Sequence, residues 1–168
     1  MPNMGRYDEV VNSFSWEISE KELGYRPGDV INIGEYCTDR NLRLGRRDRP
    51  ALIWEGHSGE VKKYTFYDLS VLTNTIAGLL KNLGLQPGDR ICLFMDRIPE
   101  LYFGFLGILK MGGIAQPLFS AFGSESLITR LEDAQTAAVI TQRKHLPKVR
   151  NIVESLPYLK HLIVVDDD

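Results

Sequence analysis

The run Ile91 to Met95 carries no polar side chain, and it follows a Pro-Gly turn at residues 87–88. A strand without a polar face must be covered on both sides, as in a parallel sheet flanked by helices. Apolar residues recur every three or four positions over residues 98–111, which predicts a helix that is buried on more than one side. Two glycines at residues 112–113 end this helix, and another apolar strand begins at Ile114. This strand–helix–strand unit restricts the chain to an α/β fold.

The rest of the chain repeats this unit. Strands are predicted to begin near Ile91, Ile114, Ala137 and His161, at nearly equal intervals. Helices are predicted between them, at about residues 98–111, 124–134 and 144–155. Crossovers between parallel strands are almost always right-handed. We therefore expect an α/β fold with a partly parallel, doubly wound sheet that helices flank on both faces.

The N-terminal part has a different character. Residues 1–30 contain aromatic residues without a clear period and predict an irregular arm, with one short helix near Tyr7 to Phe14. Residues 31–168 predict the first part of a large domain. This part begins with a helix of about residues 33–44, which Gly45 ends.

A β-hairpin and a long helix follow. Residues 50–54 and 61–64 have strand character and flank a glycine-containing loop, which predicts an antiparallel hairpin. Thr65 can cap the next helix, and Asp68 suits its positive end. Apolar residues recur at helical spacing from residue 66 to residue 83, so we expect an amphipathic helix that covers a sheet.

The composition excludes several classes of protein. The formal net charge is -2, which argues against a general nucleic-acid surface. No apolar run approaches the ~20 residues that span a bilayer. The first residues also lack the apolar core of a signal peptide. The two cysteines, Cys37 and Cys92, lie at apolar positions and are predicted to be buried thiols in a reducing compartment. We therefore expect a cytoplasmic protein with no nucleic-acid or membrane partner.

The sequence contains no catalytic or metal-binding motif that we can identify. GxGxxG, GxxxxGK[ST] and GxSxG are all missing from it. The histidines, His57, His145 and His161, are isolated and lack the cysteine or acidic companions of a metal site. Gly104 and Gly107 fall inside an apolar helix, where small residues permit close packing. We therefore predict no catalytic residue and no metal ligand in this chain.

One loop is a candidate binding site. Residues 119–123, Phe-Ser-Ala-Phe-Gly, follow a predicted strand at its carboxyl end, where open α/β sheets bind ligands. Ser124 can cap the next helix, whose free N–H groups attract anions. Phe119 and Phe122 either pack against a slender apolar ligand or fill the core, and composition does not decide between these alternatives.

A second loop follows the next strand. It contains Thr141, Gln142, Arg143 and Lys144. Its two basic residues either meet a phosphate group or form the solvated start of a helix.

Several segments resemble one family of enzymes. Residues 32–42 (NIGEYCTDRNL), 50–56 (PALIWEG) and 64–69 (YTFYDL) are similar to the start of AMP-forming acetyl-CoA synthetases. Residues 88–100 and 112–114 resemble the same region of adenylate-forming acyl-CoA synthetases in general. The resemblance covers most of the chain.

This resemblance implies an acid–thiol ligase that works in two steps. The carboxylate of acetate, or of another short carboxylic acid, attacks the α-phosphate of ATP and gives an acyl-adenylate and pyrophosphate. The thiol of coenzyme A then displaces AMP. ATP, coenzyme A and magnesium are the cofactors that the resemblance implies.

The resemblance also implies where coenzyme A binds. In the family, the loop after the strand equivalent to residues 114–118 contacts coenzyme A and usually reads aromatic-Gly-Gly-Phe-Ser. Residues 119–123 keep both aromatics and replace the two glycines. The family also places arginines after the next strand, near the 3′-phosphate of the coenzyme. The implied coenzyme A contacts are Phe119, Ser120, Ala121, Phe122, Arg143 and Lys144.

Other motifs of the family are missing from these residues. They are the Ser/Thr/Gly-rich phosphate loop, the Tyr-Gly-x-Thr-Glu segment, the hinge acid and the C-terminal catalytic lysine. We therefore expect residues 31–168 to be an incomplete domain that is cut before the phosphate loop. Its expected partner is the missing C-terminal remainder of the same chain, and the segment alone is expected to form no thioester.

Two alternatives stay open at this point. One is another adenylate-forming ligase, of the fatty-acyl or peptide-synthetase type. The other is a non-catalytic α/β interaction module, since one fold serves many functions.

Overall fold

The computed structural model describes residues 5–166 of the chain. Residues 1–4 of the predicted arm, together with Asp167 and Asp168 after the last predicted strand, lie outside the described residues. The chain divides into two compact units, Met1–Ile31 and Asn32–Asp168.

Two short helices occupy most of the first unit's described residues. α1 (Tyr7–Ser13) confirms the short helix predicted there. α2 (Trp16–Leu23) lies where the sequence predicts irregular structure, so that prediction is wrong. The side chain of Ser15 accepts a hydrogen bond from the N–H of Ile18, and Gly24 takes a left-handed conformation with φ 74°. These residues cap the two ends of α2.

The second unit begins with two helices where one was predicted. α3 (Ile33–Cys37) and α4 (Asp39–Arg43) meet at Thr38, whose φ of -120° and ψ of -83° are not helical. The break turns the chain so that Thr38 is buried and Cys37 is exposed. The prediction of a buried thiol is therefore wrong for Cys37, while it is confirmed for Cys92.

The predicted hairpin and long helix are both present. β1 (Pro50–Glu55) and β2 (Val61–Thr65) pair in antiparallel fashion, and α5 (Phe66–Asn82) follows directly. Thr65 Oγ1 accepts a hydrogen bond from the N–H of Asp68 at 3.1 Å, and the Asp68 carboxylate accepts one from the N–H of Thr65 at 2.9 Å. This capping box satisfies free donors at the start of α5.

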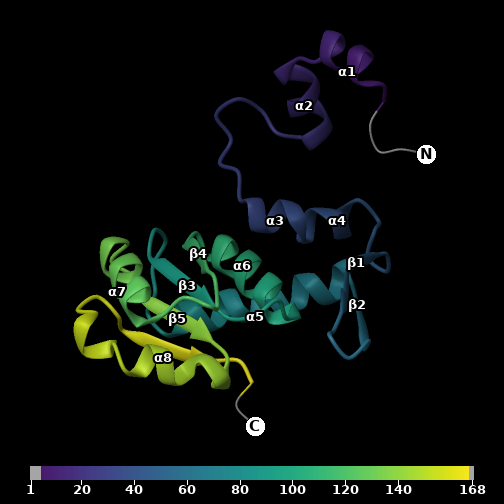
Figure 1. The fold of residues 1–168 in the computed structure, drawn as a ribbon. Helices are drawn as coiled ribbons and strands as arrows, with labels where there is room; N and C mark the ends of the chain where they lie inside the picture. The colour runs from purple at the N-terminus through teal and green to yellow at the C-terminus, as the bar shows by residue number, and fades with distance from the viewer. Residues whose placement is uncertain (1–4, 167–168) are drawn as a thin grey trace. The chain divides into compact units, whose positions relative to one another are not determined.

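Four parallel strands form the main sheet, in the order β4-β3-β5-β6 (Figure 1). They are β3 (Arg90–Phe94), β4 (Ile114–Leu118), β5 (Ala138–Thr141) and β6 (His161–Val164). Each lies where the sequence predicts a strand. In the register, Leu93 is opposite Pro117 on one side and Ile140 on the other. The predicted α/β fold with a parallel sheet and a hairpin is confirmed.

The crossovers between the strands are mostly as predicted. α6 (Pro99–Met111) and α7 (Ser124–Asp133) confirm the first two predicted helices. The third prediction, one helix over residues 144–155, is wrong. That crossover consists of a 3-10 turn (Arg143–His145), α8 (Leu146–Arg150) and a second 3-10 turn (Val153–Ser155). It is interrupted because Pro147, which has no N–H to donate, favours the first turn of a new helix.

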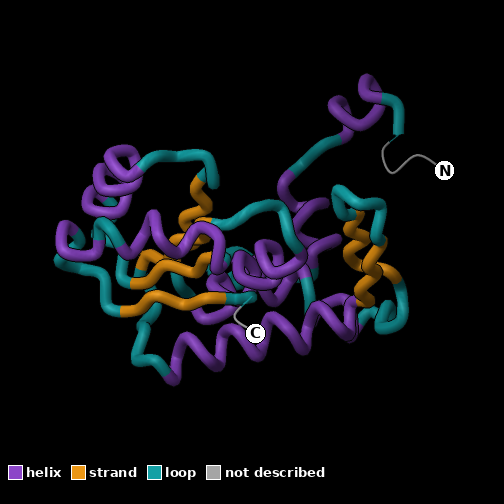
Figure 2. Tube along the Cα trace, turned by 60° about the horizontal axis from the view of Figure 1, so that its bottom comes forward, coloured by secondary structure: helices purple, strands orange, loops and turns teal. Residues whose placement is uncertain are grey.

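Helices cover both faces of the sheet (Figure 2). One core joins α5 and α6 to the sheet, and a second core joins α7 and α8 to the opposite face. Along β3, Ile91 and Leu93 belong to the first core, whereas Cys92 and Phe94 belong to the second. Successive residues of a strand point to opposite faces, so both faces of β3 are apolar.

Two glycines let α6 approach its neighbours closely. A Cβ atom on Gly104 would lie 2.8 Å from Cδ2 of Leu93. A Cβ atom on Gly107 would lie 2.7 Å from Cγ2 of Ile76 and 3.1 Å from the carbonyl oxygen of Thr73. The predicted packing role of these glycines is confirmed.

Candidate functional site

Three loops meet where β3, β4 and β5 end, because parallel strands present their carboxyl ends at one edge of the sheet. The first loop contains Asp96, the second is residues 119–123, and the third begins at Gln142. We refer to this region as the carboxyl edge. It contains all the residues that the sequence analysis assigns to coenzyme A binding.

Asp96 connects these loops. Its carboxylate forms an ion pair with Lys144 and lies 2.9 Å from Nε2 of His145, and its backbone N–H donates to Oε1 of Gln142 at 2.8 Å. Hydrogen bonds from Lys144, Ser120 and His145 hold the pKa of the Asp96 carboxyl well below its ordinary range. Asp96 therefore stays ionised and fixes residues from both neighbouring loops.

The loop of residues 119–123 places one aromatic ring outward and one inward. Phe119 is 64% exposed, whereas Phe122 is half-buried and packs against the second core. The two rings meet edge to face, with centroids 5.9 Å apart. The guanidinium of Arg130 lies 4.4 Å from the centroid of the Phe122 ring. The two alternatives, packing in the core and packing against a ligand, thus apply to different rings. Phe122 packs in the core, and Phe119 is exposed and available to a ligand.

Ser124 does not have the predicted capping role. α7 is capped by Gly123, with φ -82° and ψ 173°, and the Ser124 side chain makes no capping hydrogen bond. Ser124 is already the first residue inside the helix, so its side chain is past the position from which a cap reaches the free N–H groups.

The third loop contributes basic residues. Arg143 and Lys144 lie in the 3-10 turn after β5, and both are exposed. The backbone N–H of Arg143 donates to Oδ1 of Asp166 at 2.6 Å. Lys148 Nζ donates to the carbonyl oxygens of Ser120 at 3.0 Å and Phe122 at 3.4 Å. The third loop therefore carries positive charge, and α8, the helix that follows it, supports the aromatic loop through Lys148.

A groove of about 450 Å³ opens between the ends of β3 and β4. Its apolar wall includes Leu101, Leu118 and Phe119, and its polar residues are Asp96, Arg97 and Ser120. An apolar wall with a few polar groups is typical of sites that bind small organic molecules.

Ser120 and Lys144, two of the residues assigned to coenzyme A, are brought together through Asp96. The sequence analysis missed Asp96, His145 and Lys148. His145 is not isolated as the sequence suggested, because the fold places Asp96 beside it. The sequence could have indicated Asp96, because this residue follows the end of a predicted strand, as the two predicted binding loops do.

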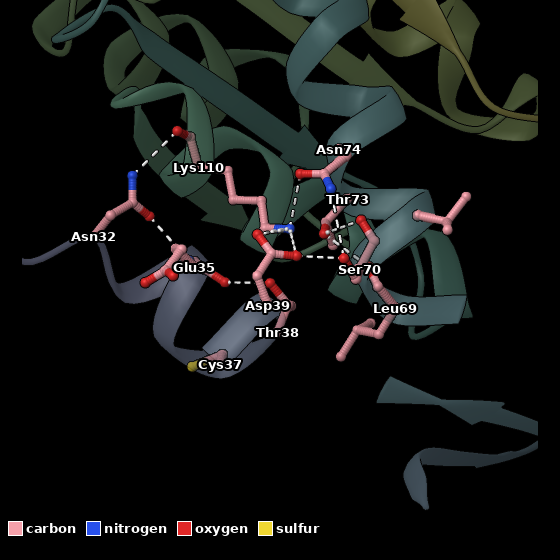
Figure 3. Close-up of polar contacts among 12 residues, drawn as sticks. Asn32, Glu35, Cys37, Thr38, Asp39, Leu69, Ser70, Thr73, Asn74 and Lys110 are labelled. Atoms are coloured by element: carbon pink, nitrogen blue, oxygen red, sulfur yellow. Dashed lines mark hydrogen bonds and ion pairs between the residues drawn. The ribbon is translucent and has the colours of Figure 1, made fainter. Parts of the chain in front are cut away.

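A second polar cluster lies among α4, α5 and α6 (Figure 3). Lys110 Nζ lies 2.9 Å from a carboxylate oxygen of Asp39 and 2.9 Å from Oδ1 of Asn74, and the Lys110 side chain is only 5% exposed. Ser70 donates its hydroxyl to the same carboxylate. Asn32 caps the end of α6 by donating to the carbonyl oxygens of Leu109 and Lys110, each at 3.1 Å. The charges in this cluster pair with one another, so we assign it to the stability of the fold.

The described residues contain no group of three or more His, Cys, Asp or Glu side chains that could hold a metal ion. No helix in this part of the chain is long and apolar enough to cross a membrane.

A family model described as "AMP-binding enzyme" matches residues 40–168. The chain belongs to the AMP-binding enzyme family.

Curated relatives refine the comparison. The chain is 34% identical to the acetyl-coenzyme A synthetase of Bacillus subtilis, over 97% of this chain and 28% of that protein. It is 33% identical to the acetyl-coenzyme A synthetase of Streptomyces coelicolor, over 94% of this chain and 25% of that protein. The chain thus spans about a quarter of the length of these relatives, and the aligned part is their N-terminal region.

Solved structures agree with this assignment. An acyl-CoA synthetase of Brucella canis superposes with a TM-score of 0.81 and 26% identity, over 98% of this chain and 30% of that one. The anthranilate CoA ligase AuaEII, in complex with anthranoyl-AMP, superposes with a TM-score of 0.71 and 27% identity, over 80% of this chain and 25% of that one. The fold is that of the corresponding part of adenylate-forming ligases.

Proposed function

We propose that this chain supplies the N-terminal part of an AMP-forming ligase that joins acetate, or another short carboxylic acid, to coenzyme A. The reaction would proceed through an acyl-adenylate made from the acid and ATP with magnesium, followed by attack of the coenzyme A thiol and release of AMP. The similarity to acetyl-coenzyme A synthetases along nearly the whole chain carries this proposal. A cytoplasmic location accompanies it as a further prediction.

The carboxyl edge supports a role in binding coenzyme A. The exposed ring of Phe119 forms part of the groove wall, where the narrow pantetheine chain could pack against it. Arg143 and Lys144 project positive charge at the same edge, which suits the phosphates of the coenzyme. Lys144 is paired with Asp96, so a phosphate would have to share this lysine with the carboxylate.

The proposal assigns ATP and magnesium to the complete enzyme, because the phosphate loop and the other catalytic motifs of the family are missing from these residues. Within the described residues, no acidic cluster could hold a divalent cation. We assign no catalytic step to a residue of this chain.

A calorimetric titration with coenzyme A tests the proposal. We expect saturable binding, and a loss of affinity of about tenfold in Phe119→Ala, because the variant loses the apolar contact between the ring and the pantetheine chain, and tenfold corresponds to about 1.4 kcal/mol. Tyr158→Ala is the matched control, since Tyr158 is another exposed aromatic at 48% and does not line the groove. Equal affinity in all three proteins, or no binding by any of them, would contradict the proposed role of this edge.

A different carboxylic acid is the second candidate function. The structural match to an anthranilate CoA ligase favours it, because that protein shares this fold at an identity similar to that of the acyl-CoA synthetase structure. Both candidates use the same two-step chemistry and the same coenzyme. Pyrophosphate release by the proposed complete enzyme, measured with acetate and with anthranilate, distinguishes them.

A further inference from the structure

Contacts from distant parts of the sequence hold the loop of residues 119–123. Lys148 of α8 reaches it from one side, where Nζ donates to the carbonyl oxygens of Ser120 at 3.0 Å and Phe122 at 3.4 Å. On the other side, the Ser120 side chain makes a hydrogen bond to the Asp96 carboxylate. The loop is therefore fixed by residues that follow two other strands. Asp96 follows β3, which is next to β4, and Lys148 follows β5, which lies on the far side of β3.

The surroundings of Lys148 indicate why a lysine occupies this position. Its side chain is half-buried, and Nζ lies 5.7 Å from the centroid of the Phe94 ring. In the described part of the chain, its contacts are the two carbonyl oxygens and this ring face, with no carboxylate. A charged donor makes stronger hydrogen bonds to carbonyl oxygens than a neutral one does. Lys148 thus ties two carbonyl groups of one short loop to α8.

The loop itself has an ordinary backbone. The N–H of Phe122 donates to the carbonyl oxygen of Phe119 at 3.0 Å and closes a turn. No residue from 119 to 123 has a positive φ, so Ser120 and Ala121 fit without strain. Residues with a Cβ atom have fewer accessible backbone conformations than glycine, which lowers the entropy lost when the loop is ordered.

We propose that Lys148 is a positioning residue for coenzyme A, which fixes residues 119–123 so that the Phe119 ring stays at the wall of the groove. This inference rests on the proposed function, because it assumes that coenzyme A binds in the groove. Lys148 is not itself one of the predicted coenzyme A contacts. Lys148 acts through the loop: both of its hydrogen bonds end on loop carbonyl groups, on either side of Ala121.

The first test measures hydrogen exchange at the Phe122 amide. Lys148→Met keeps most of the aliphatic stem and removes the donor, so exchange at this amide should become about tenfold faster, the loss expected for one or two charged hydrogen bonds. Amides of β5 should be unaffected. Lys148→Arg should restore slow exchange. Lys160→Met, which removes the same charge from an exposed side chain near the start of β6, should leave the loop unchanged. Unchanged exchange in Lys148→Met would overturn the inference.

The second test compares coenzyme A with adenosine 3′,5′-bisphosphate, which lacks the pantetheine chain. Lys148→Met should weaken the binding of coenzyme A about tenfold and leave the binding of the bisphosphate unchanged, because a displaced Phe119 affects only the pantetheine end. Equal losses for both ligands would mean that Lys148 acts only through its charge, and would overturn the inference.

The two tests separate this inference from the proposed function. A wild-type protein that fails to bind coenzyme A would contradict the proposed function. The exchange comparison would still decide whether Lys148 holds the loop, because it needs no ligand.

Discussion

At the scale of single residues, Asp96 is the most informative side chain of the carboxyl edge. It accepts hydrogen bonds from Lys144, Ser120 and His145, which follow two different strands. These partners are 24 to 49 residues away in the sequence and meet only because parallel strands end at the same edge. Local sequence patterns do not show such a cluster. Lys144 and Ser120 were named as coenzyme A contacts only because the family resemblance implies them, whereas Asp96 and His145 were not.

Asp96→Asn should lower the free energy of unfolding by about 1 kcal/mol at pH 7, a modest value because solvent screens a pair that is partly exposed. The partners depress the folded-state pKa of Asp96 below the ordinary value of 3.8. The stabilisation is therefore complete above the unfolded-state pKa and is lost as the pH falls through the folded-state pKa. Denaturant titrations of both proteins at several pH values measure this difference.

Asp133→Asn is the control for this prediction. Asp133 is an exposed carboxylate at the end of α7, and its replacement should change the free energy of unfolding by less than about 0.5 kcal/mol. A difference between wild type and Asp96→Asn that stays constant or grows on acidification would refute the role assigned to the Asp96 carboxylate.

At the scale of elements, the sequence predicts what depends on periodicity and misses what depends on single positions. All four strands of the main sheet were predicted, because their apolar runs reflect burial on both faces. α2 was missed, although Ser15 and Gly24 are recognisable cap residues at its two ends. The single helix predicted over residues 144–155 was wrong because Pro147 favours the first turn of a separate, shorter helix, α8.

Close packing of α6 gives a prediction at this scale. Gly107→Ala should destabilise the protein by about 1–3 kcal/mol, because the added methyl group would overlap the Ile76 side chain and approach the Thr73 carbonyl. Gly78→Ala is the matched change in α5, where no atom lies within 4 Å of the added Cβ. It should stabilise the protein by about 0.5–1 kcal/mol, since alanine favours a helix more than glycine does. Thermal unfolding of both variants measures the contrast, and destabilisation of similar size in both would contradict the packing described for α6.

At the scale of the whole molecule, the account depends on the parallel sheet and on the edge where its strands end. Leu93, Ile140 and Ile163 lie side by side on β3, β5 and β6, and Val139 lies one residue before this row. The sequence predicted the four strands and their parallel sheet, because each strand–helix unit carries its own signal, but it did not predict the register or the order of the strands. The candidate site was only partly predictable from the sequence. Phe119 and Phe122 lie in one short loop directly after a predicted strand, so they could be named together. Lys148 lies in α8, and its side chain reaches that loop only in the folded protein.

The most direct test of the account is an NMR titration of the isotope-labelled protein with coenzyme A. The account predicts that backbone amide shifts change mainly at the carboxyl edge, at Asp96, in residues 119–123 and in residues 142–148. Amides at the opposite end of the strands, such as Gly112 and His161, should keep their shifts. Changes concentrated at that opposite end, or no change at saturating coenzyme A, would contradict it.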